Sequence, residues 1–120
     1  MKFNNRQWHD SIIKSIYIDR NNPGIIDTVS FDIKWTNGKM TKLTFIDVYW
    51  ASFNLNFGII AQESILTAKA LEKNDQDLIN FYKKWKGKRD GIDLTSYLIE
   101  LNSTGSTIKI IAKDFKFTKL

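Results

Sequence analysis

The stretch Val29-Ser30-Phe31-Asp32-Ile33-Lys34-Trp35-Thr36-Asn37-Gly38-Lys39 decides the fold of this chain. From Val29 to Trp35, apolar and polar residues alternate, which is the period of a strand with one buried and one solvated face. Asn37-Gly38 then indicates a tight turn, and residues 40–50 are rich in β-branched and aromatic side chains. The sequence therefore predicts an antiparallel β-hairpin.

The apolar faces of its two arms fix the register of this hairpin. A turn of two residues would place Phe31 opposite Thr44 and leave the apolar face unmatched. A turn of three residues, with Gly38 in the left-handed conformation, pairs Phe31 with Leu43 instead. We therefore expect the second register and a positive φ at Gly38.

Three further segments have the composition of strands. Residues 11–19 are rich in isoleucine and end at an Asn-Asn-Pro-Gly turn. Residues 94–102 and 107–117 flank a loop of four polar or small residues, Ser-Thr-Gly-Ser, which sets Ile99 opposite Ile110. These segments predict a first strand before the central hairpin and a second hairpin after it.

Two helices are expected between the hairpins. Residues 62–72 are made mainly of helix formers. Asn74 then caps a segment that Gly87 ends, and its apolar residues recur at helical spacing: Leu78, Phe81, Tyr82 and Trp85. The predicted fold is a single α+β domain over residues 1–120, an antiparallel sheet of about five or six strands with one or two helices packed on it.

Composition removes several classes of chemistry. The chain has no cysteine and a single histidine, His9, so thiol nucleophiles, disulfides and zinc sites built on cysteine are excluded. Its 120 residues, 42% of them apolar, suit one compact core. We find no run of signal-peptide or membrane-spanning length, and expect a soluble cytoplasmic protein without a cofactor or metal.

The net charge of +5 comes from one place, the basic segment Lys83-Lys84-Trp85-Lys86-Gly87-Lys88-Arg89. Taking its five cations from the 18 basic residues leaves 13, which equals the number of acidic residues. Cations around an aromatic ring could bind phosphates and stack on a base. Alternatively, they complement the dipole at the end of a helix that begins with Asp75 and Asp77. We favour the second interpretation.

Three other groups of residues could form sites. His9-Asp10 could act as an acid–base pair, but neighbouring residues on an extended segment point apart, so we favour a structural role. Asp27 and Asp47 lie opposite each other in the predicted register and could bind a cation or divide acid and base roles, unless a bulge near Ile46 turns Asp47 outward. Residues 49–58 contain four aromatics, which suit a binding groove or a strand of the core.

Trp8-His9-Asp10-Ser11, followed by an isoleucine-rich strand and the alternating hairpin that ends in Leu43-Thr44-Phe45-Ile46-Asp47-Val48, resembles small uncharacterised bacterial proteins and some immunity proteins of polymorphic toxin systems. The resemblance covers roughly the first sixty residues and carries no catalytic residue. It implies a domain that binds and blocks a protein toxin.

From the residues and the resemblance we expect a non-enzymatic domain that binds another protein. The alternative function is a module that binds a small molecule or, through the basic segment, nucleic acid without sequence preference. We expect no membrane contact. Exposed aromatics would anchor the partner and the basic segment would steer it. The candidate binding residues are Trp8, His9, Asp10, Trp50, Lys84, Lys86, Lys88 and Arg89.

Overall fold

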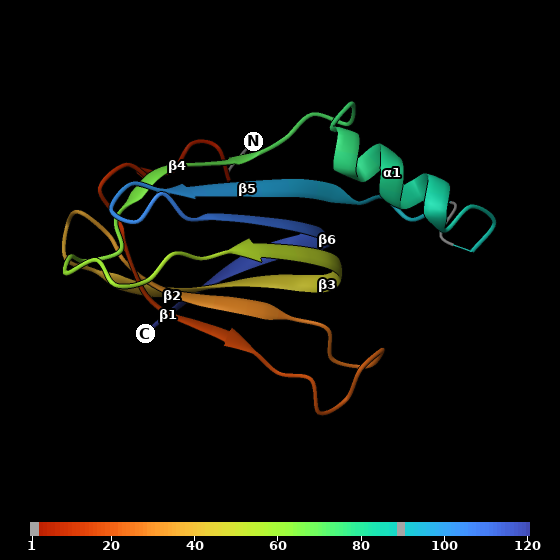
Figure 1. The fold of residues 1–120 in the computed structure, drawn as a ribbon. Coiled ribbons are helices and arrows are strands. Elements are labelled where there is room, and N and C mark those ends of the chain that lie inside the picture. The colour runs from red at the N-terminus through yellow and green to blue at the C-terminus, as the bar shows by residue number, and fades with distance from the viewer. Residues whose placement is uncertain (1–2, 89–90) are drawn as a thin grey trace.

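The computed structural model describes residues 3–88 and 91–120, which form a six-stranded antiparallel sheet and one helix (Figure 1). The strands lie in the order β1-β2-β3-β6-β5-β4. The elements are β1 Ile12–Ile18, β2 Val29–Lys34, β3 Met40–Asn54, β4 Ile65–Ala70, α1 Gln76–Lys84, β5 Thr95–Leu101 and β6 Thr107–Lys119. The architecture agrees with the α+β class and is mainly β.

The hairpin of β2 and β3 has the predicted register. Phe31 pairs with Leu43, and both side chains are fully buried. Gly38 has a φ of 86°, and its N–H donates to the Trp35 carbonyl at 2.9 Å. The turn chemistry and the apolar pattern therefore agree, and both the register and the positive φ are confirmed.

Replacing Gly38 with Val should lower the free energy of unfolding by about 1–2 kcal/mol, because a β-branched residue resists a positive φ. No atom lies within 4 Å of the position that its Cβ would take, so the loss comes from the backbone. Urea unfolding measures the change. Gly38→Asn is the control and should lose less, since Asn tolerates this conformation. A Val variant as stable as the native chain would contradict the assigned turn.

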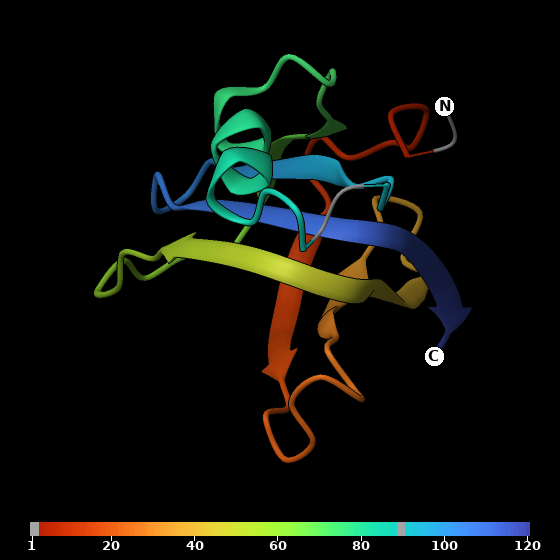
Figure 2. The same ribbon diagram turned by 90° about the vertical axis from the view of Figure 1, so that its right-hand side faces the viewer.

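The sheet curls until its two edge strands meet at one end. Ile12 of β1 forms a bridge with Ser64, the residue before β4. The Ile65 N–H also donates to the Ser11 carbonyl at 2.7 Å. At the other end of the molecule the sheet is open, with α1 above and the β1–β2 connection below the long strands β3 and β6 (Figure 2).

The main core fills the inside of this curl, and the N-terminal segment completes it. Phe3 is fully buried, with its ring centroid 5.0 Å from those of both Tyr97 and Phe115. Trp8 is 4% exposed, and its Nε1 donates to the Phe3 carbonyl at 2.6 Å. The expectation of an exposed Trp8 is therefore wrong, because the indole is part of the core.

A second, smaller core lies between α1 and the opposite face of the sheet. Buried side chains of the helix and the sheet meet there: Leu78, Phe81, Leu94 and Ile111. The cap of α1 is Asp75, whose carboxylate accepts from the Leu78 N–H at 3.1 Å, so the predicted cap at Asn74 is wrong by one residue. Within the described residues, no helix has the length and apolarity needed to cross a membrane.

The helix predicted over residues 62–72 is wrong, because β4 occupies this segment. Its residues favour a helix locally, but Ile65 and Ala68 are buried in the main core. Ala68 also pairs with Ile99 of β5. Long-range pairing and burial override the local propensity here.

The hairpin of β5 and β6 exists, but its predicted register is wrong by two residues. Ile99 pairs with Ile108 rather than with Ile110. The Leu101 N–H donates to the Ser106 carbonyl at 2.9 Å, so the loop consists of residues 102–105. A shift of two leaves every side chain on its face of the sheet. The apolar pattern therefore could not distinguish the two registers.

Candidate functional site

The middle of β3 is irregular and turns two aromatic side chains toward α1. Asp47 is exposed with a φ of 52°, which confirms its predicted outward turn. Just after it, the pairing of β3 with β6 shifts register between Val48 and Trp50. A bulge lets consecutive side chains leave the strict alternation of a strand. As a result, Tyr49 and Trp50 both pack against the second core.

Between β3 and α1 lies a cavity of about 280 Å³, which we call the helix groove. It is lined by Tyr49, Trp50, Asp77, Asn80, Phe81, Lys84 and Trp85. The rings of Tyr49 and Phe81 meet edge to face at 6.0 Å and form one wall. The groove thus joins two predicted binding residues, Trp50 and Lys84, and adds a wall of aromatic rings.

A second cavity, of about 450 Å³, shares Tyr49 and Trp50 with the helix groove and extends to the β1–β2 connection. We call it the hairpin cavity. Asp27 lines it and accepts from Arg20 Nη1 at 2.9 Å and from the Gly24 N–H at 3.1 Å. The hydrogen bond from Gly24 has the largest effect on the pKa of Asp27, and the bond from Arg20 adds to it, so the pKa is lowered. The carboxylate is therefore already paired.

The structure gives no support to a cation site between Asp27 and Asp47. Arg20 neutralises Asp27, whose backbone carbonyl accepts from the Val48 N–H at 2.8 Å, while Asp47 is exposed. Across residues 3–88 and 91–120, no cluster of three or more potential ligands is arranged to hold a metal ion.

An ion-pair network fixes the first turn of α1 to the sheet. Lys109 Nζ lies 2.6 Å from a carboxylate oxygen of Asp75 and 2.6 Å from one of Asp77. Asp75 also accepts from the Ser96 hydroxyl at 2.9 Å. Burial raises the pKa of Asp75, but the hydrogen bonds from Lys109, Ser96 and the Leu78 N–H outweigh it, so the pKa is lowered overall.

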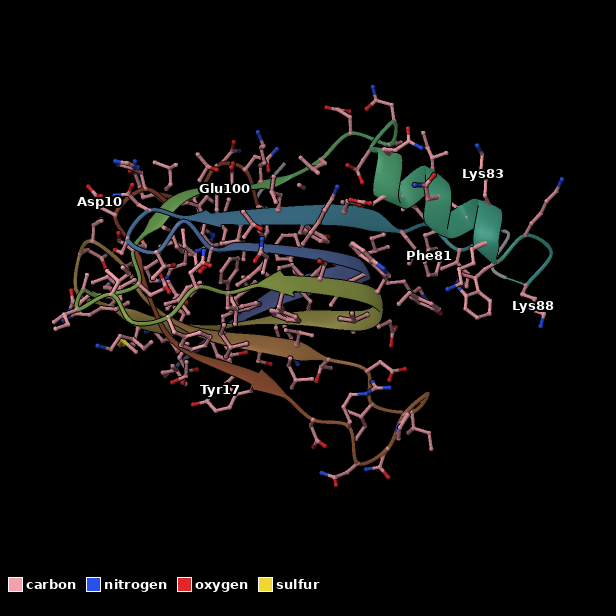
Figure 3. All side chains as sticks on the ribbon, in the orientation of Figure 1. Asp10, Tyr17, Phe81, Lys83, Lys88 and Glu100 are labelled. Carbon is pink, nitrogen blue, oxygen red and sulfur yellow. The ribbon has the colours of Figure 1, made fainter. Side chains whose placement is uncertain are left out.

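The described part of the basic segment, residues 83–88, extends from the last turn of α1 into solvent (Figure 3). Lys84, Lys86 and Lys88 are exposed, and within the described part of the chain none of them forms an ion pair. The Lys84 amino group lies 5.6 Å from the centroid of the Trp85 ring. Arg89 lies outside the described residues. The cations follow the end of a helix that starts with carboxylates, as the dipole favours.

His9 and Asp10 lie at a turn that closes the sheet. The turn has a positive φ of 68° at Asp10 and brings His9 Nε2 within 3.5 Å of Asp10 Oδ1, so the prediction that the two side chains point apart is wrong. Both are about two-thirds exposed. The Ser11 hydroxyl is fully buried and donates to the Gln7 carbonyl, so it is not free to act as a nucleophile for His9. This geometry favours the structural role.

The predicted binding residues separate into two groups. Asp10 lies at the opposite end of the molecule from Lys88 (Figure 3), so His9 and Asp10 share no site with the basic segment. Trp50 lies beside Lys84 in the helix groove. Sequence reasoning missed the contact of Lys109 with α1. The alternation of side chains along β6 could have indicated this contact, because it places Lys109 on the same face of the sheet as Ile111, which packs against α1.

Comparisons with protein-family models, with curated proteins and with solved structures find no match for this chain.

Proposed function

We propose that this chain is a non-catalytic domain that binds another protein and blocks it, as immunity proteins do with bacterial toxins. The observation that carries the proposal is the helix groove, whose lining combines the ring of Trp50 with Lys84, a cation that forms no ion pair within residues 3–88 and 91–120. Aromatic side chains in partly buried settings, surrounded by other contacts, supply most of the energy of protein interfaces. The resemblance of the N-terminal motif to immunity proteins points the same way.

The charges beside the groove favour an acidic partner. The amino groups of Lys84, Lys86 and Lys88 are exposed and form no ion pair within the described residues, so their field extends into solvent. Such a field raises the rate at which an oppositely charged protein associates, and salt screens it. The groove would then supply the apolar contact after the first encounter.

A non-catalytic role agrees with the state of the carboxylates. Arg20 pairs with Asp27, Lys42 pairs with Asp32, and Lys109 pairs with the carboxylates at the start of α1. Groups bound in this way stabilise the fold and are poorly placed to exchange protons with a substrate.

The test is co-expression of the chain with the product of the neighbouring gene, which this proposal expects to encode a toxin. The chain should suppress toxicity and co-purify with that protein, and Trp50→Ala should weaken the complex at least tenfold, because truncating an aromatic anchor costs about 2 kcal/mol or more. Isothermal titration measures the affinity. Leu66→Ala is the control, since Leu66 is an exposed residue of β4 and should change affinity little. Unchanged affinity in Trp50→Ala would contradict the proposed anchor.

A second candidate is a binding module for nucleic acid, favoured by the exposed lysines around Trp85, Lys84, Lys86 and Lys88, which form no ion pair with any residue that the structure describes. If phosphates bind there, affinity should fall steeply with salt. The variant with Lys84, Lys86, Lys88 and Arg89 replaced by Gln should then lose retention on DNA at about 0.15 M salt. We expect instead no such retention by the native chain and only a small loss of helix stability in the variant, measured by thermal unfolding. Salt-sensitive, sub-micromolar DNA binding by the native chain would favour the second candidate.

A small molecule is the remaining alternative. The hairpin cavity, at about 450 Å³, lies within the usual size of ligand pockets. A ligand there would contact Trp50, which lines the cavity, so quenching of tryptophan fluorescence that Trp50→Ala abolishes would support this alternative.

A further inference from the structure

The outer edge of β1 is covered at its start and open beyond it. The Ile13 N–H donates to the Glu63 carbonyl at 2.9 Å. From Ser15 to Ile18, β1 pairs with β2 on one side, and from Lys14 onward no described segment bonds to its backbone on the other. Alternate N–H and C=O groups of an edge strand point away from its partner. This part of β1 therefore presents unpaired backbone groups to solvent.

The other edge strand, β4, is occupied. The Asn4 side chain accepts from the Ala70 N–H at 2.7 Å and donates to the Ala70 carbonyl at 3.4 Å. The Asp10 N–H donates to the Ile65 carbonyl at 2.9 Å. The N-terminal segment therefore protects β4, whereas β1 has only Lys14 and a register shift near its start as protection against pairing.

A groove of about 350 Å³ lies beside the first part of β1, where residues 13–16 line it. Its apolar walls come from both sides: Ile13 and Ile16 from β1, Leu55 and Phe57 from the segment after β3, and Leu101 from β5. Phe57 is 84% exposed, so its ring is available to a partner. Two charged residues also line the groove: Lys14, which forms no ion pair within the described part of the chain, and Glu63, whose carboxylate accepts from the Thr104 hydroxyl at 3.0 Å.

We propose that the edge of β1 from Lys14 to Ile18 binds an extended segment of a partner protein as an added strand. The unpaired backbone specifies a strand, because a helix satisfies its own hydrogen bonds and could not use this edge. Alternate apolar side chains of the segment enter the groove, and an acidic residue faces Lys14. The inference rests on the proposed protein-binding function and adds a contact separate from the helix groove.

The probe is a library of capped peptides, each about eight residues long, in which apolar residues alternate with threonine and one position is aspartate. Each peptide is also made in a second form, in which the backbone nitrogen of every other residue is methylated. N-methylation removes backbone donors and leaves the side chains unchanged. Peptides that bind should lose at least tenfold in affinity when methylated in the register that faces β1. Fluorescence anisotropy measures the affinity, and nuclear magnetic resonance should show shifted amide signals in residues 14–18.

Variants of the chain locate the site. Ile18→Lys should weaken peptide binding at least tenfold, because a charge on an open edge opposes strand addition. Leu66→Lys, on the protected strand β4, is the control and should change affinity less than twofold. Trp50→Ala should also leave peptide affinity unchanged, which separates this site from the helix groove.

Three results would overturn the proposal. The first is equal affinity of methylated and unmethylated peptides, and the second is absence of binding across the library at about 1 mM peptide. The third is pairing of β1 with β1 of a second copy, which sedimentation would show as a dimer that the Ile18→Lys variant does not form. The last result would assign the edge to self-association instead.

Discussion

Replacing Trp8 with Ala should lower the free energy of unfolding by about 3–5 kcal/mol, the usual cost of removing a buried aromatic side chain. The indole is 4% exposed, with its ring centroid 4.7 Å from Phe3 and 5.1 Å from Trp35. The truncation would leave a cavity and an unpaired Phe3 carbonyl. Chemical denaturation measures the loss.

Trp8→Phe is the matched control and should lose less, because a second ring still fills most of the site. Since Trp8 is part of the core, folded Trp8→Ala should bind the partner as the native chain does. A loss of stability below about 1 kcal/mol, with partner binding abolished, would restore Trp8 as a binding residue and contradict its assignment to the core.

Replacing Asp75 with Ala should lower the free energy of unfolding by about 2–3 kcal/mol. The change removes the cap of α1, worth about 1 kcal/mol, and takes one carboxylate from Lys109, which is 19% exposed. Asp77→Ala is the control. Asp77 is 44% exposed and does not cap the helix, so solvent screens its pair and its loss should be smaller.

The effect of Asp75→Ala should depend on pH in one direction. Because the pKa of Asp75 is lower in the folded chain, its carboxylate stabilises the fold above its ordinary pKa. That contribution is lost as the pH falls through the lowered value. The difference between native chain and variant should therefore be full at pH 7 and shrink below about pH 4. A difference that stays constant down to pH 2 would contradict the ion-pair network.

Local features of the sequence were sufficient for the first hairpin. The alternation up to Trp35 and the left-handed position at Gly38 act over a few residues, and the structure follows both. The helix that ends before Gly87 could also be predicted from the pattern of its own residues. Features that depend on distant partners could not be predicted, because no local pattern specifies which segment pairs with β4 or fills the inside of the curl.

The candidate site was predicted in part for the same reason. Trp50 and Lys84 were identified by residue type, but only the bulge after Asp47 and the packing of α1 bring them into one groove. Trp8 is also a tryptophan, but it lies in the core, where its Nε1 donates to the Phe3 carbonyl, and its role is structural. Residue type therefore selected candidates, and long-range packing decided which of them face a partner.

The most direct test of the proposed function is the hydrogen–deuterium exchange of the chain, alone and in complex with the toxin that co-purifies with it. Backbone exchange reports which segments a partner covers. We expect slower exchange in the complex at Tyr49 and Trp50 and over residues 80–86. Slower exchange confined to residues 7–11, with the helix groove unchanged, would contradict it.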